Sequence, residues 1–575
     1  MSEITSFPSF SKSLFSGFIL DELVFPFPLM NKDEEENVNM ILDSIRKFCE
    51  NYVDSAKFDK LEHFPEDVIN GMKELGLFGL VIPEEYGGFG LSTTAYVRIL
   101  EEIARYDGSM ALIAGAHQSI GLKGLLMYGS EEQKKKYLPK LATGELLAAF
   151  CLTEPAAGSD AAGIKTRAVR DDKKGIYTIN GNKMWITNGG IANFFTVFAK
   201  EELDIPGEGK KDKITAFMIT RDMGIQSGKE EEKMGIHATS TTEIILDNVQ
   251  VPVANVIGKP GKGFKIAMEI LNTGRIGLAG GNVGGSKTAL KYVLKHAKER
   301  HQFGRPLISF ELIREKLAEM AMRIYIGESI VYLTTHLIDQ GNIDFSLESA
   351  IGKALATEYL WINVNEAQQI AGGIGYSREY PYEQWVRDAR INLIFEGTNE
   401  IMRIFIALSG IQERGEYLKK MGKALNDPIK GFGLLTDYAV HYMKERLTTE
   451  RLPDVHPVLG QAKSAFEEWT KNLHITTERV LIKYGKKIIQ KQIIQRRLAD
   501  CAIDLYAMIA AISRTDHCIK TKSEAQCKRQ ILYCNTFCEQ AWRRIRRNLL
   551  MIDKNNDDEL LAIAEQVIED GEYKI

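Results

Sequence analysis

The chain has 575 residues, of which 44% are hydrophobic and 26% are charged. This composition is typical of a soluble globular protein with several domains, and it excludes collagen-like and disordered chains. A formal net charge of -4 over so long a chain creates no general field that attracts nucleic acid, so we expect no nucleic-acid partner.

The first half of the chain predicts a helical domain followed by a β domain. Residues 1–33 are an N-terminal extension that resembles neither a secretory signal nor an Arg-rich transit peptide. Residues 34–144 are predicted to be helical, because apolar residues recur at i, i+3, i+4 and i+7 in "NVNMILDSIRKFCENYVD" and "PEDVINGMKELGLFGL". From 145 to 262 the period changes to two, as in "NFFTVFAK" and "KITAFMIT", with Asn-Gly and Gly-Gly turns between runs. This part predicts a central antiparallel, β-barrel-like domain.

Helical periodicity returns at residue 263. Long helices are predicted over roughly 263–300, 309–339, 346–371 and 399–420, which together form a helical-bundle domain over 263–422. The break "MGKALNDPIKGFG" separates a further helical extension over 423–575. The predicted fold class is therefore mainly α with one central β domain. No apolar run reaches the roughly 18 residues of a membrane span.

The segment 426–446 has two interpretations. It combines apolar with basic residues, as does a helix that lies in a bilayer interface. The same pattern fits a helix that packs on another helix, for example one in a second subunit. The apolar members are Ile429, Phe432, Leu434, Leu435, Val440 and Met443, and the basic ones are Lys430, Lys444 and Arg446. Six basic residues downstream would add attraction to anionic lipid: Lys483, Lys486, Lys487, Lys491, Arg496 and Arg497.

Cysteine and histidine usage argues against disulfide and metal frameworks. The seven cysteines are odd in number and form no CxxC pair, which predicts reduced thiols and a reducing compartment. The ten histidines include no HExxH or other ligand spacing, so we expect no metal. The glycine clusters "GGFG", "AGGIGYS" and "GLAGGNVGGS" do not follow a strand within a βαβ unit, which excludes a Rossmann site. We interpret the last cluster as a face where another helix or a flat cofactor comes close.

Glu396 stands between an apolar run and a glycine in "INLIFEGTNEIMR". A carboxylate in such dry surroundings has a raised proton affinity and suits a general base. The alternative is a helix entry, in which Thr398 or Asn399 caps the following helix and Glu396 is only a first-turn charge.

Two further segments carry groups suited to a planar ligand. "FCLTEPAAGSD" offers hydroxyls and backbone N–H groups around Thr153 and Ser159, and "KMWITNGG" offers the aromatic Trp185 beside Thr187. Taken singly, each is more simply a strand end with a loop, or a core tryptophan. Together with Glu396 they would enclose a planar redox ring.

Five motifs of the chain resemble, in order and spacing, the motifs of the acyl-CoA dehydrogenase family. These motifs are "CLTEPAAGSDAAGIKTRA", "MWITNGG", "AMEILNTGRIG", "ERHQFGRPL" and "IFEGTNEIMR". The resemblance continues through "QRRLADCAIDLYAMIAAISR" into the C-terminal extension, which is similar to the very-long-chain subgroup, and "LVFPFP" with "YPYEQWVRDAR" is most similar to its mitochondrial member that also acts in complex I assembly. The resemblance implies that fold, with a helical, a β and a four-helix-bundle domain.

The resemblance also implies roles for residues. Glu396 would be the catalytic base, and the positions that match FAD contacts are Phe150, Leu152, Thr153, Gly158, Ser159, Trp185, Thr187, Arg300, Gln302, Phe303, Gln369, Gly372, Gly373, Thr398 and Glu400. The positions that match substrate contacts are Ser159, Asn272, Arg275 and Gly397, with Gly115 and Ala116 at the floor of a deep acyl pocket. Two departures, His237 and Asn272, affect the CoA contacts. Arg387 has either a ligand role or an internal ion pair with Asp388 or Glu383.

The expected function is FAD-dependent α,β-dehydrogenation of long-chain acyl-CoA, with hydride transfer to flavin N5 and electrons passed to an electron-transferring flavoprotein. The expected assembly is a homodimer with a possible peripheral membrane contact through the C-terminal region. The expected location is the cytoplasm in a bacterium, or the mitochondrial matrix or inner membrane in a eukaryote. The alternative is an assembly or scaffold protein of complex I biogenesis in which catalysis is secondary.

Overall fold

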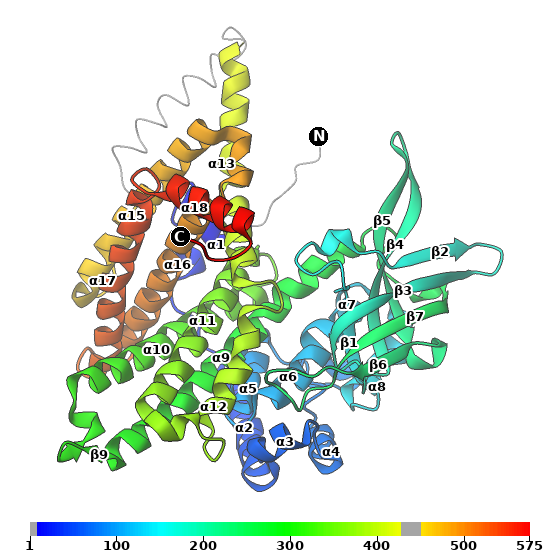
Figure 1. Cartoon of the computed structure of the whole chain (residues 1–575), viewed down its shortest axis with the longest axis horizontal. Helices are drawn as coiled ribbons and strands as arrows, with labels where there is room; N and C mark the ends of the chain where they lie inside the picture. The colour runs from blue at the N-terminus through cyan, green and yellow to red at the C-terminus, as the bar shows by residue number, and fades with distance from the viewer. Residues whose placement is uncertain (1–7, 427–449) are drawn as a thin grey trace. The chain divides into compact units, whose positions relative to one another are not determined.

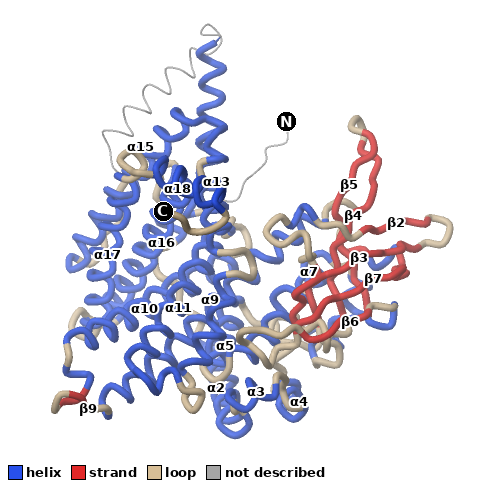
Figure 2. The backbone as a smooth tube through the Cα atoms, viewed as in Figure 1, coloured by secondary structure: helices blue, strands red, loops and turns tan. Residues whose placement is uncertain are grey.

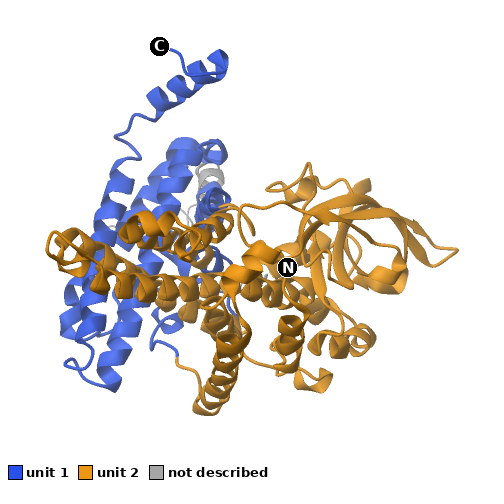
Figure 3. Cartoon of the chain, turned by 60° about the horizontal axis from the view of Figure 1, so that its bottom comes forward, with its two compact units in different colours: residues 1–28, 342–351, 399–575 blue, residues 29–341, 352–398 orange. Residues whose placement is uncertain are grey.

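The computed structural model describes residues 8–426 and 450–575. The element order is helices, then strands, then helices, as predicted (Figures 1 and 2). The chain divides into two compact units, one of residues 29–341 and 352–398 and one of residues 1–28, 342–351 and 399–575 (Figure 3).

The first helical layer of the larger unit begins with well-capped amphipathic helices. The side chain of Asn31 caps α2 by accepting from the backbone N–H of Glu34, and Ser92 caps α5 in the same way. The helices are α2 (Lys32–Tyr52), α3 (Ser55–Leu61), α4 (Glu66–Glu74), α5 (Thr93–Ala104), α6 (Gly108–Gly115), the π-helical turn η3 (Ala116–Gly121), α7 (Lys123–Tyr128) and α8 (Glu131–Ala142). In α2 the buried residues are Val38, Leu42, Ile45 and Cys49, which is the spacing of one helix face.

The β domain is one sheet with strand order β6-β7-β3-β2-β4-β5-β8, in which β1 also pairs with β4. Its strands are β1 (Ala148–Cys151), β2 (Arg167–Asp171), β3 (Ile176–Thr187), β4 (Phe194–Ile205), β5 (Gly209–Thr220), β6 (Gln226–Glu230), β7 (Thr241–Pro252) and β8 (Val256–Ile257). The fully antiparallel prediction was wrong for two pairs, because β1 and β2 each run parallel to β4. Parallel neighbours require a crossover, and intervening strands supply it here, a long-range arrangement that local turn signals do not encode.

The bundle of the larger unit is built on α9 (Gly263–Glu299), with α10 (Glu311–Asp339), α11 (Ser346–Ala371) and α12 (Tyr382–Arg390). The predicted glycine face of α9 is a close helix contact. A Cβ at Gly280 would overlap Val97 of α5, and one at Gly284 would overlap the carbonyl oxygen of Glu101. Close packing therefore explains this part of the glycine cluster.

The smaller unit joins the N-terminus to the C-terminal extension. Its helices are α1 (Phe10–Phe15), α13 (Asn399–Asn426), α15 (Gly460–Tyr484), α16 (Gln492–Thr521), α17 (Lys528–Leu550) and α18 (Asp557–Asp570). The ring of Phe10 contacts that of Tyr506 at 6.1 Å between centroids, and Phe15 is fully buried. The N-terminal segment is therefore part of a core in this unit.

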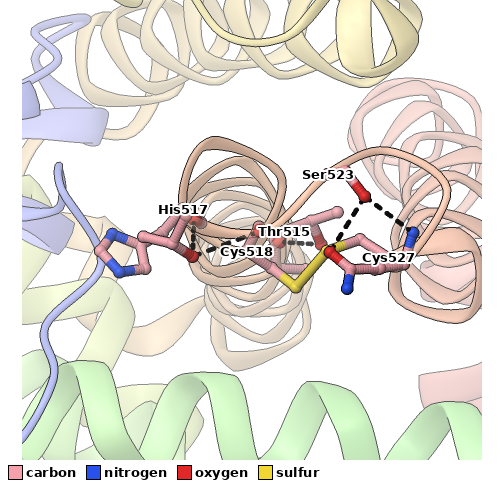
Figure 4. Close-up of a disulfide and its surroundings, with 8 residues drawn as sticks. Thr515, His517, Cys518, Ser523 and Cys527 are labelled. Atoms are coloured by element: carbon pink, nitrogen blue, oxygen red, sulfur yellow. Dashed lines mark hydrogen bonds between the residues drawn. A yellow bond between two sulfur atoms is a disulfide. The ribbon is translucent and has the colours of Figure 1, made fainter.

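One disulfide corrects the prediction that all thiols are reduced. Cys518 at the end of α16 and Cys527 before α17 are bonded, with 6.4 Å between their Cα atoms (Figure 4). The backbone N–H of Cys527 donates to the carbonyl of Ser523, which closes the turn between the two helices. Sequence spacing missed the pair because a helical hairpin, rather than a CxxC turn, brings the two cysteines together.

The predicted interfacial segment 426–446 lies, apart from Asn426, outside the described residues. Within residues 8–426 and 450–575, no helix has both the length and the apolar character needed to cross a bilayer.

The glycine face of α9 gives a stability prediction. Gly284→Ala should destabilise the protein by about 1 to 3 kcal/mol, because the added methyl group meets the backbone of α5, which cannot move aside cheaply. Thermal denaturation checks this result. Gly281→Ala is the matched control, since its Cβ would contact that of Ala104 at an ordinary 3.6 Å and alanine favours the helix. Equal melting temperatures for the two variants would contradict the close contact.

Candidate active site

Glu396 lies in a turn of unusual backbone geometry. It follows the 3₁₀ turn Ile391–Leu393 at the end of α12, and both Glu396 and Gly397 have positive φ angles, of 55° and 94°. A non-glycine residue in this region is strained and is held there by its surroundings. Because α13 begins at Asn399, Thr398 stands directly before the helix, as the helix-entry interpretation has it, but Glu396 lies three residues ahead of the helix and is not a first-turn charge.

The carboxylate of Glu396 is poorly solvated. Its Oε2 is shielded from solvent and has no hydrogen-bond partner among the described residues. A Cβ on Gly274 of α9 would lie 3.5 Å from both carboxylate oxygens, which is an ordinary contact, and 2.8 Å from Cγ2 of Ile120, so the glycine lets α9 pass close to Ile120 beside the base. Burial raises the pKa of Glu396, while the positive charges of Arg275 and Lys353 act to lower it.

Arg275 and Asn272 lie beside this turn. Nε of Arg275 donates to the carbonyl oxygen of Glu396 at 3.3 Å, and Nη1 donates to Oδ1 of Asn272 at 2.8 Å. Burial lowers the pKa of Arg275 to about 10. The structure therefore brings these predicted substrate positions together with Glu396 and Gly397, and it engages the arginine with the backbone of the turn.

The predicted ring-facing residues also converge. The backbone N–H of Met184 donates to the carbonyl of Thr153 at 2.9 Å, which places the end of β1 next to Trp185 of β3. The side chain of Trp185 is 55% exposed, and its backbone has a φ of 61°. In the loop after Thr153, Ser159 is exposed, and a Cβ at Gly158 would meet no atom within 4 Å. Phe150 and Thr187 are half-buried and Leu152 is buried. An exposed aromatic ring beside hydroxyls and an open glycine fits the flat ring of FAD.

A buried ion pair that the sequence reasoning missed fastens this loop. Nζ of Lys183 donates to Oε1 of Glu154 at 2.7 Å and to the carbonyl of Leu152 at 3.3 Å, and the lysine side chain has no exposed surface. Oε1 of Glu154 also accepts from Oγ1 of Thr166 at 2.6 Å, and its Oε2 accepts from the N–H of Lys165. Burial acts to raise the pKa of Glu154, but these donors outweigh it and the pKa is lowered. The sequence signal was the period of two in β3, which places Lys183 on the same face as the buried Tyr177 and Ile179.

The other predicted cofactor positions face solvent. Phe303 is 93% exposed in the tip between β9 (His301–Gln302) and β10 (Arg305–Pro306). The remaining exposed positions of this group are Arg300, Gln302, Gln369, Gly372, Gly373 and Glu400, and Thr398 is half-buried.

Two further predicted positions are engaged internally. Arg387 forms ion pairs with Glu383 and Asp59, each at 2.7 Å, so the internal ion-pair interpretation is right for Glu383, with Asp59 in place of Asp388. Nδ1 of His237 lies 2.9 Å from the same Asp59. In the part of the chain that the structure describes, no group of three or more His, Cys, Asp or Glu side chains could hold a metal ion.

Four sequence models of known domains match the chain. They are the N-terminal, middle and C-terminal domains of acyl-CoA dehydrogenase, at residues 35–145, 149–249 and 261–410, and the ACAD9/ACADV C-terminal domain at residues 457–573. The description of the last domain names two proteins, ACAD9 and ACADV, so this match assigns the chain to their subgroup without distinguishing between the two.

Relatives cover almost the whole chain. The mitochondrial very long-chain specific acyl-CoA dehydrogenase of Bos taurus is 41% identical over 98% of this chain and 88% of its own length. A probable acyl-CoA dehydrogenase of Bacillus subtilis is 35% identical over 92% of this chain and 89% of its own length. The crystal structure of an acyl-CoA dehydrogenase complexed with FAD from Bacillus anthracis matches with a TM-score of 0.80 and 34% identity, over 98% of this chain and 99% of that one. The structure of butyryl-CoA dehydrogenase from Megasphaera elsdenii matches with a TM-score of 0.61 and 37% identity. This match covers 65% of this chain and 97% of that one.

The buried ion pair gives the second prediction. Lys183→Met should leave the Glu154 carboxylate buried without its cation, which costs about 3 to 5 kcal/mol and lowers the melting temperature by roughly 6 °C or more. Differential scanning fluorimetry checks this loss. Lys174→Met is the control, because Lys174 is an exposed partner of Asp171 in the same domain and its loss should change little. A melting temperature equal to that of the control would exclude a stabilising role for the pair.

Proposed function

Because the chain belongs to the acyl-CoA dehydrogenase family and is an FAD-dependent enzyme of that family, we propose that it introduces a trans double bond between C2 and C3 of long-chain acyl-CoA, with Glu396 as the base. The observation that carries this proposal is the solvent-shielded Oε2 of Glu396, which has no hydrogen-bond partner among the described residues. A buried hydrogen-bond acceptor without a donor lowers the stability of the folded protein, and a proton taken from the substrate would satisfy this acceptor.

The chemistry requires a base of this kind. The α-protons of a thioester are weakly acidic, so a carboxylate removes one efficiently only when it is desolvated and held close to the carbon. Burial of Glu396 supplies the first condition, and the bond from Arg275 to the carbonyl of Glu396 helps to hold the turn that carries the carboxylate. When bound, FAD supplies the acceptor for the hydride that leaves the β-carbon. The exposed Trp185 and the hydroxyls of Thr153 and Thr187 are the groups that would hold its ring.

The proposed preference for long chains rests on a run of small residues that leads away from the base. A Cβ at Gly277, one turn along α9 from Gly274, would lie 3.3 Å from Cδ1 of Leu100 and 3.5 Å from the ring of Tyr96. A Cβ at Gly115 would lie 3.9 Å from the same Leu100 atom. We place Gly115 and Ala116 at the far end of the proposed path, because Gly115 and Gly277 both lie next to Leu100. Each methylene that enters it contributes about 0.8 kcal/mol to binding.

The proposed partners follow from the same assignment. Electrons leave through an electron-transferring flavoprotein, and the solvent-facing Arg300, Phe303 and Gln369 serve the cofactor of a second subunit in a homodimer. An intact base turn argues for an enzyme over a pure scaffold of complex I assembly, because a scaffold has no physical need for a buried open acceptor.

A peripheral membrane contact is also proposed for the C-terminal region. The exposed apolar residues Ile482 and Ile489 lie among exposed basic residues, a composition that favours anionic lipid. These basic residues are Lys483, Lys486, Lys487, Lys491 and Arg496. Arg497 does not join them, because it is buried and bonded to Asp557.

Glu396→Gln tests the base. The amide keeps the shape and removes the proton acceptor, so reduction of the bound flavin by palmitoyl-CoA should slow by about a hundredfold to ten-thousandfold while the protein stays yellow. Stopped-flow absorbance measures the rate, with the exposed Glu379→Gln as control. If the Glu396 variant reduces its flavin at the wild-type rate, another residue is the base.

Gly115→Leu tests the acyl path. The space around Gly115 accepts a Cβ, so the leucine should fit and fill the far end of the path, which moves the optimum toward shorter chains by a few methylenes. Turnover with a series from C8 to C20 acyl-CoA measures the shift. Gly108→Ala, at a position open to solvent on the same helix, should leave the profile unchanged. An unaltered optimum in the leucine variant would remove Gly115 from the pocket.

A further inference from the structure

A buried lysine bonds to the base turn. Lys353 lies in the apolar stretch "SAIGKALA" of α11, and its side chain has no exposed surface. Its Nζ donates to the carbonyl oxygen of Gly397 at 2.8 Å. A buried ammonium group is costly unless it is well bonded, so its place in an apolar helix calls for a reason.

Two cations hold two consecutive carbonyl groups of this turn. Arg275 of α9 donates to the carbonyl of Glu396, and Lys353 of α11 donates to that of Gly397. Both residues of the turn have positive φ angles, which makes glutamate at the first position unfavourable by itself. The bonds from α9 and α11 orient the peptide planes that follow Glu396 and Gly397, and so help to hold the turn that carries the Glu396 side chain.

We propose that Lys353 is a positioning residue of the reaction, which holds the Glu396–Gly397 turn through the Gly397 carbonyl and supplies a positive charge that keeps the base ionised. This inference rests on the proposed role of Glu396 as the base. It assigns to Lys353 no contact with substrate or cofactor.

The electrostatic part has a defined sign. Among the residues that the structure describes, the charged and titratable groups that act on Glu396 or are acted on by it are Arg275 from α9, Lys353 from α11 and Tyr96 from α5. Tyr96 stays neutral, because burial raises its pKa far above neutrality. Burial raises the pKa of Glu396, and Arg275 and then Lys353 oppose this effect. Since the base acts when deprotonated, loss of the Lys353 charge moves the acidic limb of the rate profile to higher pH.

The test measures flavin reduction by palmitoyl-CoA between pH 6 and 9 on the full-length, flavin-loaded protein. In Lys353→Met the midpoint of the acidic limb should rise by about 1 to 3 pH units, since a nearby opposite charge shifts a carboxyl by that amount. The rate below the midpoint should fall about tenfold per unit and recover as the pH rises, while the half-saturating substrate concentration changes little. Thr357→Val, a buried change one turn along α11, should leave the midpoint where it is.

A second pair of variants separates charge from folding. Lys353→Arg keeps the charge and should keep the midpoint within about half a unit of the wild type, whereas Lys353→Gln keeps a donor without charge and should show the upward shift. Equal midpoints in the arginine and glutamine variants, or a methionine variant with the wild-type profile, would overturn the inference. Glu396→Gln is measured in parallel: if it still reduces its flavin, the base assignment fails, and if it is inactive while the lysine variants keep the wild-type midpoint, only the role of Lys353 fails.

Discussion

The structure of the active-site region depends on one costly feature, a carboxylate that is shielded from water and keeps an oxygen without a hydrogen-bond partner among the described residues. Such a group favours its protonated form, and the fold opposes this tendency without solvating it. Nε of Arg275 donates to the backbone carbonyl of Glu396, and its positive charge acts on the carboxylate. Positive charge is therefore close enough to favour ionisation, while the acceptor stays open for a proton.

Small residues on α9 let this helix pack closely on its neighbours. A Cβ at Gly274, beside the base, would lie 2.8 Å from Ile120, and Gly277 lies next to Leu100 and Tyr96. Gly280 and Gly284 bring the same helix against α5, so the glycines place α9 closely between the base region and the first helical layer. A long helix packed at such short distance is stiff, which keeps the geometry around Glu396 well defined.

Sequence reasoning succeeded where the signal is local and failed where it depends on distant partners. The helices over 263–371 follow from their periodicity, and the open, dry carboxylate follows from the apolar run before Glu396. The parallel pairing of β1 with β4 depends on a crossover, and the Cys518–Cys527 bond depends on a helical hairpin. Lys183 and Lys353 were missed because a single lysine in a strand or a helix carries no mark of its partner, which lies 29 residues away in one case and 44 in the other.

The base turn and the ring-facing strand are joined through the loop 233–240. A Cβ at Gly235 would lie 2.5 Å from the carbonyl carbon of Arg387, so this loop packs directly on the backbone of α12, the helix that leads to Glu396. The carboxylate of Asp388 accepts from the N–H of Ile236, whose φ is 49°. The same loop continues into Thr241, which pairs with Thr187 across β7 and β3. Because the connection uses backbone contacts and one buried carboxylate, it limits changes in the distance between the proposed proton acceptor and the strand that would hold the flavin ring. A reaction that removes a proton and a hydride from adjacent carbons requires that both acceptors be held at a fixed separation, and this loop contacts both the helix that leads to Glu396 and the strand that would hold the ring.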